Sequence, residues 1–159
     1  MAADPATLAS IPLFSKLSKK DLSRLLKAAH DTTYEAGTVL ASEDEVGRFF
    51  FIVLDGEAKV EIRGRQVNTL GPGDYFGEMA LIDRSIRSAT VTATSTLHCL
   101  TLTQTEFRPF ATEHSDVAWA LLEAMVQRVR DAEARASAAH AANDANANAN
   151  ATATANETQ

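Results

Sequence analysis

The chain is poor in the features that secreted and membrane proteins need. Cys99 is the one cysteine among 159 residues, so no internal disulfide bond can form. The N-terminus lacks the charged, apolar and small-residue succession of a secretory leader. The most apolar run, residues 49–54, is far shorter than the roughly 20 residues that cross a bilayer. These absences predict a cytoplasmic protein with no membrane partner.

Positive charge and metal ligands are also scarce. Lys and Arg number 15 against 21 Asp and Glu, and the formal net charge is −6. The chain therefore lacks the broad positive field of a nucleic-acid-binding protein, and we expect no DNA binding by this chain alone. Any anion that it binds must be held locally. The histidines lack the HxH, HExxH or CxxC spacing of metal sites, which argues against zinc; they are His30, His98, His114 and His140.

The composition and the apolar pattern predict one folded domain. Hydrophobic residues make up 45% and charged residues 23% of the chain, which is the balance of a soluble globular protein. Apolar residues at helical intervals predict one or two short helices in an N-terminal segment, residues 1–30. Within it, Ser18 and Asp21 resemble a capping box with Asp in place of Glu.

Residues 31–102 consist of short β-branched and aromatic runs separated by turn sequences such as Asp55-Gly56. The alternation of apolar and charged residues over 58–63 is typical of a strand with one buried face. The strand-length segments are 49–54, 57–63, 66–70, 88–94 and 96–102. We predict an α+β fold in which an antiparallel β-roll of about eight strands, a double-stranded β-helix or jelly roll, is flanked by N-terminal helices and two C-terminal helices.

Two C-terminal helices are predicted within residues 103–140. Thr103 and Glu106 form a capping box at the start of the first helix, which Pro109 should limit or kink. The second helix should begin near Ser115. Its apolar stripe comprises Ala118, Leu122, Met125, Val129, Ala132, Ala136 and Ala139.

Two features of the C-terminal region have structural interpretations. Trp119 lies on the long helix and is expected to pack against a neighbour. Residues 141–159 are rich in Ala and Asn and carry no bulky apolar side chain that could offset the entropy of ordering. They are predicted to form a disordered tail.

Residues 76–91, FGEMALIDRSIRSATV, carry the chemistry of the chain. The segment 77–82 lies between predicted strands and is predicted to be a one-turn helix, whose free backbone amides suit an anion. Arg87, nine positions after Glu78, adds a guanidinium, and Ser88 adds a hydroxyl where the next strand begins. Together these groups fit a small phosphate.

Glu78 conflicts with a simple anion site, because a carboxylate repels a phosphate. A ribose resolves the conflict, since its 2′-hydroxyl can donate a hydrogen bond to Glu78 while the phosphate faces Arg87. A phosphate cyclised onto the same sugar holds both groups at one fixed spacing. It also carries a single charge, which one arginine can offset.

The segment resembles the phosphate-binding cassette of the cyclic nucleotide-binding domain, the module of catabolite activator proteins, protein kinase A regulatory subunits and nucleotide-gated channels. The resemblance rests on the Phe-Gly-Glu-x-Ala-Leu start, the Arg-x-Ala-Thr end and the gap between them, and it extends over roughly residues 10–140. It implies that Glu78 binds the ribose 2′-hydroxyl and Arg87 the phosphate oxygens. The residues that would line the phosphate pocket are Gly77, Met79, Ala80, Ser88 and Ala89. Ile86 departs from the pattern, since many members have Pro at this place.

The resemblance implies a cyclic nucleotide sensor that is not an enzyme. It would bind cAMP or cGMP without a further cofactor. Its C-terminal helices, residues 103–140, would serve as lid or hinge and would change position with Leu81 and the turn from Phe107 to Phe110. Ser88 is compatible with either base, so selectivity stays open. The partners implied are an unidentified effector protein and a weak homodimer through the long helix, with a seam of Ala118, Leu122, Met125 and Val129.

Three alternatives belong to other functional classes. A cupin-type metalloenzyme has a similar β-roll, and the turn 71–74 is a weak hint of one, but His30 and His98 lack neighbouring ligands. A transcription factor would need DNA-binding helices from another chain. A degenerate domain that has lost its ligand would act as a protein interaction module; Glu78 and Arg87 argue against it.

Overall fold

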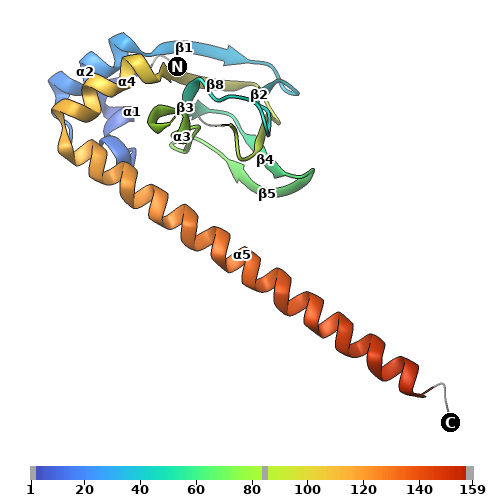
Figure 1. Ribbon diagram of the computed structural model, residues 1–159. Helices are drawn as coiled ribbons and strands as arrows, with labels where there is room; N and C mark the ends of the chain where they lie inside the picture. Colours follow the sequence, from blue (N-terminus) through green and yellow to red (C-terminus); the bar gives the residue numbers. More distant parts are fainter. Residues whose placement is uncertain (1–2, 84–85, 157–159) are drawn as a thin grey trace. The chain divides into compact units, whose positions relative to one another are not determined.

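Two four-stranded antiparallel sheets form the centre of the fold (Figure 1), in a computed structural model that describes residues 3–83 and 86–156. One sheet has the strand order β1-β8-β3-β6 and the other β2-β7-β4-β5. The strands are β1 His30–Tyr34, β2 Val39–Ala41, β3 Phe49–Asp55, β4 Ala58–Ile62, β5 Arg65–Leu70, β6 Tyr75–Phe76, β7 Thr90–Ala93 and β8 Leu97–Thr103. The helices are α1 Pro5–Ala9, the 3-10 helix η1 Pro12–Phe14, α2 Lys19–Ala28, α3 Met79–Ile82, α4 Gln104–Glu113 and α5 Ser115–Asn156. This arrangement confirms the predicted α+β roll with flanking helices.

The strands follow the alternation and turn signals of the sequence. Each of the five predicted strand segments coincides with an observed strand to within two residues at either end. Gly56 shows why one turn needs glycine. Its φ is 84°, and a Cβ on it would collide with the carbonyl oxygen of Thr96. The β3–β4 turn therefore packs against the turn before β8.

An aromatic cluster joins the helices to the β1-β8-β3-β6 sheet. The ring centroids of Phe14 and Phe50 lie 6.5 Å apart, and Phe107 lies 6.0 Å from Phe50. These three residues come from η1, β3 and α4, and all are buried in one apolar core. In Figure 1, α1, α2 and α4 gather at the same end of the roll. The core thus fixes α4 against β3, a strand that also contributes to the candidate functional site.

A second core lies between the sheets and supports the strands on either side of the predicted cassette. Phe51 and Phe76 stack with ring centroids 4.6 Å apart, which fixes β6 against β3. Val91 of β7 is buried in the same cluster. Cys99 is also buried there, and burial raises the pKa of its thiol to about 12.

Helix α4 begins with the capping box that the sequence predicts. The Thr103 hydroxyl accepts from the backbone N–H of Glu106 at 3.3 Å, and the Glu106 carboxylate accepts from the backbone N–H of Thr103 at 2.7 Å. Pro109 lies inside the helix, which continues to Glu113. The predicted break therefore occurs four residues later, at the junction with α5.

The start of α5 packs differently from the prediction. The chain divides into two compact units, residues 1–121 and 122–159, and the first seven residues of α5 belong to the first unit. Val117 and Leu121 enter the core of that unit, although the predicted apolar stripe contains neither. Trp119 is 64% exposed, so the expectation that it packs against a neighbour is wrong. The core takes an i, i+4 pair on one face of the helix and leaves the indole on another.

The tail also differs from the prediction. Helix α5 continues through the Ala- and Asn-rich segment to Asn156, where the sequence had indicated disorder from residue 141; residues 157–159 lie outside the described part. Alanine has the strongest helix propensity of the ordinary residues. A helix that is already formed extends without a new nucleation step, so an Ala-rich segment can continue it.

Candidate functional site

The predicted cassette lies between β6 and β7, where the chain leaves one sheet and enters the other. Gly77 and Glu78 follow β6 directly, and α3 supplies the one-turn helix that the sequence predicts. Residues 84 and 85 lie outside the described residues. The described part of the cassette therefore consists of its two ends, which carry Glu78 and Arg87.

Gly77 allows the two ends to approach closely. Its φ is 80°, in the left-handed region that favours glycine. A Cβ at this position would lie 2.6 Å from the carbonyl oxygen of Phe49 and would collide with the Arg87 guanidinium. Glycine is required here both by the backbone conformation and by the arginine that lies against it.

The Arg87 side chain is anchored to the first residue of β3. Its Nη2 donates to the carbonyl oxygen of Phe49 at 2.6 Å, which leaves other N–H groups of the guanidinium for a ligand. Burial lowers the pKa of Arg87 below its ordinary value, and the Coulombic attraction of Glu78 opposes that change. The guanidinium is therefore partly desolvated, and an anion that reaches it meets a stronger field than at the surface.

Glu78 is buried with only 1% of its surface exposed. It precedes α3 as the N-terminal capping residue, and its carboxylate interacts electrostatically with Arg87. A buried carboxylate needs a cation or a hydrogen-bond donor beside it. Burying a polar group without a partner costs about 1–3 kcal/mol, and a charged group costs more. The structure thus brings together an acceptor suited to a hydroxyl and a cation suited to a phosphate.

The other predicted pocket residues have a variety of environments. Met79 is 38% exposed and Ser88 is exposed, whereas Ala89 is half-buried just before β7. The side chains of Ala80 and Leu81 lie outside the described residues. The geometry therefore unites Gly77, Glu78 and Arg87, and the pocket roles of the remaining residues stay predictions.

Sequence reasoning missed the partners that hold Arg87. The loop between β2 and β3 runs beside it: the Arg87 backbone N–H donates to the Glu45 carbonyl at 2.7 Å, and the Asp44 N–H donates to the Arg87 carbonyl at 3.0 Å. Val46 and Ile86 form an isolated antiparallel bridge next to these bonds. The partners of Arg87 in all these contacts, Phe49 included, contribute only backbone atoms, so no side-chain pattern in the sequence signals them.

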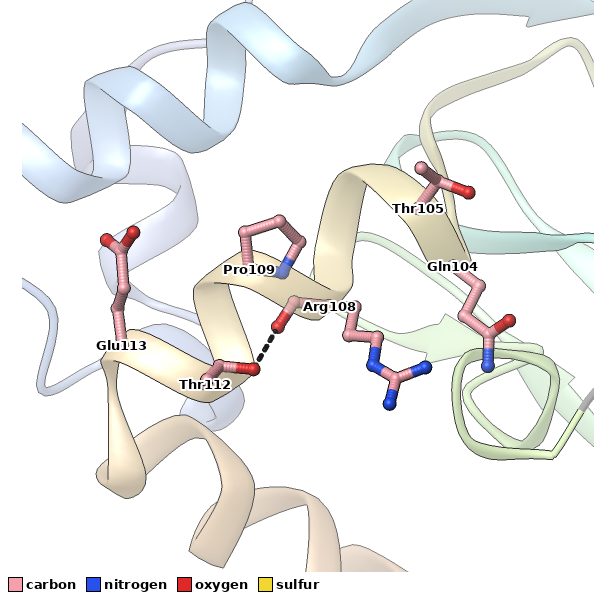
Figure 2. Close-up of a pocket in the computed structure, with 6 residues that line it drawn as sticks. All are labelled: Gln104, Thr105, Arg108, Pro109, Thr112 and Glu113. Carbon is pink, nitrogen blue, oxygen red and sulfur yellow. Dashed lines mark hydrogen bonds between the residues drawn. The ribbon is translucent and has the colours of Figure 1, made fainter.

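Helix α4 lies next to the cassette. The Gln104 side-chain amide donates to the carbonyl oxygen of Ile82, the last residue of α3, at 3.2 Å. A groove of about 450 Å³ runs along this helix (Figure 2) and includes Arg108 and Thr112, whose hydroxyl donates to the Arg108 carbonyl. The rest of its described lining is Gln104, Thr105, Pro109 and Glu113. None of these residues belongs to the predicted phosphate pocket.

Phe107 and Phe110, at the ends of the turn that is expected to move, are both buried in the core that contains Val117 and Leu121.

Among the residues that the structure describes, no group of three His, Cys, Asp or Glu side chains is placed to hold a metal ion. Within the same residues, no helix combines the length and apolar character that spanning a bilayer requires.

Comparison with known proteins places this arrangement in a family. Residues 31–114 match the family model of the cyclic nucleotide-binding domain. The chain is 44% identical over 102 residues to a cAMP-dependent protein kinase regulatory subunit of Eremothecium gossypii, an alignment that covers 64% of this chain. The part of this chain that aligns spans only 22% of the length of that relative. It spans 24% of the length of a second regulatory subunit, from Schizosaccharomyces pombe.

Solved structures agree with the fold. The catabolite activator protein of Thermus thermophilus superposes with a TM-score of 0.70 at 27% identity, over 77% of this chain and 60% of that chain. The regulatory domain of Toxoplasma gondii PKA, solved with cAMP, superposes with a TM-score of 0.61 at 36% identity, over 66% of this chain and 42% of that chain. The residues matched by the family model, 31–114, include the strands from β2 to β8 and the cassette.

Proposed function

Because the chain belongs to the cyclic nucleotide-binding domain family, we propose that its cassette binds cAMP or cGMP through Glu78 and Arg87 and that binding repositions the C-terminal helices. One observation carries this proposal: the half-buried guanidinium of Arg87 lies against Gly77 and within the field of the buried Glu78. A cyclic phosphodiester with a free 2′-hydroxyl satisfies both charges, since it brings one negative charge for Arg87 and one donor for Glu78.

The protein would act as a regulator and not as an enzyme. Its relatives include a regulatory subunit of a cAMP-dependent protein kinase, which supports an effector protein as the receiver of the signal. A weak homodimer through α5 is part of the proposal, with Leu122 and Val129 of the predicted seam both exposed. Location in the cytoplasm also belongs to the proposal and rests on the sequence alone.

Titration calorimetry with cAMP and cGMP tests the proposal, with 5′-AMP as the matched control. 5′-AMP has the same base and sugar as cAMP, but its phosphate is open and carries a higher charge, which one arginine does not offset. We expect saturable binding of at least one cyclic nucleotide and much weaker binding of 5′-AMP. Absence of binding by both cyclic nucleotides would contradict the proposal and favour the interaction module instead.

A further inference from the structure

Glu43 is bonded at both its main chain and its side chain. It lies in the loop between β2 and β3, outside the cassette. Its backbone N–H donates to the hydroxyl oxygen of Thr90 in β7 at 3.0 Å, and its carboxylate accepts from the backbone N–H of Arg63 at 2.7 Å. The side chain thus ties the loop to the turn between β4 and β5, and the main chain ties it to the strand that follows the cassette.

The residues after Glu43 hold the backbone of Arg87. The Arg87 N–H donates to the carbonyl of Glu45, and the Arg87 carbonyl accepts from the N–H of Asp44. Both backbone polar groups of Arg87 are therefore satisfied by one short loop. A shift of that loop would move the Arg87 backbone while the Phe49 carbonyl still holds Nη2 of the guanidinium, so the orientation of the guanidinium toward a ligand would change.

The loop and the turn that Glu43 joins each contain a strained residue. Asp44 of the loop has φ 68° and Arg63 of the β4–β5 turn has φ 51°, both in the left-handed region, which is unfavourable for a non-glycine residue. Such conformations persist where surrounding bonds determine them. The Glu43 carboxylate bonds the second of these residues and is adjacent in sequence to the first, so it connects both strained positions.

The negative charge of the loop argues that Glu43 supports the structure and does not contact the phosphate. Glu43, Asp44 and Glu45 are consecutive acidic residues beside Arg87, the cation of the proposed phosphate site. Negative side chains near that site oppose a phosphate through space. The carboxylate of Glu43 is instead directed at a backbone N–H, where a charged acceptor makes a strong hydrogen bond.

We propose that Glu43 is a positioning residue for Arg87: by fixing the loop 43–46 to the β4–β5 turn, it sets where the guanidinium meets the phosphate of a cyclic nucleotide. This inference rests on the proposed function, because it assigns Glu43 a role in the same binding site. Glu43 touches no ligand in this scheme and acts through the backbone of Arg87 alone.

Glu43→Ala, Glu43→Gln and Glu35→Ala test the proposal. Glutamine keeps an acceptor oxygen, and Glu35 is an exposed glutamate before β2 that controls for loss of one charge. Calorimetry should show a three- to tenfold loss of cyclic nucleotide affinity for Glu43→Ala, the size expected for one hydrogen bond, and affinity near that of the parent for the other two. Hydrogen exchange of the free protein should show faster exchange of the Asp44 and Arg87 amides in Glu43→Ala alone.

A double-mutant cycle separates positioning from general stability. In an Arg87→Ala background, Glu43→Ala should cost no further affinity, with competition against a fluorescent cyclic nucleotide extending the measurable range. An equal loss in both backgrounds, or unchanged affinity and unchanged amide exchange in Glu43→Ala, would overturn the inference while leaving the proposed function intact. If the parent protein binds neither cyclic nucleotide, the proposed function fails first.

Discussion

Arg87 is the residue with the largest expected effect on binding. Arg87→Ala removes charge-assisted hydrogen bonds to a desolvated phosphate, each worth about 1.5–3 kcal/mol, so affinity for cyclic nucleotide should fall by about ten- to a hundredfold or more. The chain should still fold, with some loss of stability because Arg87 also offsets the charge of the buried Glu78. Titration calorimetry measures the affinity and thermal unfolding checks the fold.

Arg48→Ala is the matched control for that experiment, since Arg48 is an exposed arginine one residue before Phe49. Removing it also removes one positive charge near the site, but no buried guanidinium. The control should bind almost as tightly as the parent. Unchanged affinity in a folded Arg87→Ala protein would refute the assignment of the phosphate ligand.

Glu78 is expected to recognise the sugar. If its buried carboxylate accepts from the 2′-hydroxyl, the 2′-deoxy cyclic nucleotide should bind more weakly by about 1–3 kcal/mol, because the acceptor loses its donor. Glu78→Gln should reduce this preference for ribose. Competition binding with both ligands measures the effect, and equal losses for ribose and deoxyribose ligands would mean that Glu78 only shapes the cassette.

Gly77 and Gly64 separate backbone strain from crowding. Both have positive φ, 80° and 72°, but a Cβ at Gly64 would meet nothing within 4 Å, whereas one at Gly77 would collide with Arg87. Each glycine-to-alanine substitution should cost stability of about 1 kcal/mol from the left-handed backbone. Only Gly77→Ala should also weaken nucleotide binding, because it displaces the guanidinium. Comparable affinities of the two variants would show that Arg87 adjusts without loss.

At the level of elements, the N-terminal end of α4 should lose stability in acid. Burial raises the pKa of Glu106, but hydrogen bonds from the Thr103 backbone and hydroxyl and from His30 outweigh it, so the pKa is lowered overall from 4.5. A carboxyl whose pKa is lower in the folded state stabilises the protein above its unfolded pKa and loses that contribution as the pH falls through the folded value. The contribution should therefore begin to decline as the pH falls below about 4.5 and should be lost once the pH is below the folded pKa.

Thermal unfolding of Glu106→Gln and the parent between pH 7 and pH 3 measures this loss. The parent should be more stable at neutral pH, and the difference should shrink as the pH falls below about 4.5. Glu123→Gln, at an exposed glutamate of α5, controls for the change in charge. A difference that stays constant with pH would show that the capping box acts without its ionised carboxylate.

The elements that the sequence predicts well are those with local causes. The capping box at Thr103 depends on two side chains three residues apart, and strand β4 depends on alternation within its own residues. The cassette was recognisable because its chemistry requires particular side chains, Glu78 and Arg87, at a fixed spacing. In each case the residues that carry the pattern also make the structure.

The elements that the sequence predicts poorly depend on distant partners or on backbone atoms. The loop 43–46 binds Arg87 through main-chain groups, which any residue type supplies. Val117 and Leu121 of α5 are buried in the core, and this depends on where α4 ends. The apolar stripe predicted from the sequence did not include that end point and contained other residues. The prediction of disorder from residue 141 fails up to Asn156, because alanine favours a helix through its own propensity and needs no bulky apolar contact to do so.

At the scale of the whole molecule, described contacts connect the cassette to the beginning of α5. Gln104 bonds the last residue of α3 to α4, and Phe107 and Phe110 of α4 share a core with Val117 and Leu121. A displacement of α3 can therefore reach the long helix through packed elements of residues 1–121. A ligand shifts such a system only if it contacts two arrangements differently.

We expect a cyclic nucleotide to change the fluorescence of Trp119 and to protect amides of residues 115–135 from hydrogen exchange. Trp119 reports on this change because it is exposed in the present structure, so any new neighbour alters its surroundings. Arg87→Ala at the same ligand concentration is the control and should show neither effect. Protection of the cassette around Glu78 and Arg87, with unaltered helix amides and unaltered fluorescence, would mean that the protein binds its ligand passively, because ligand contacts would then stabilise the site without favouring a second arrangement of the helices.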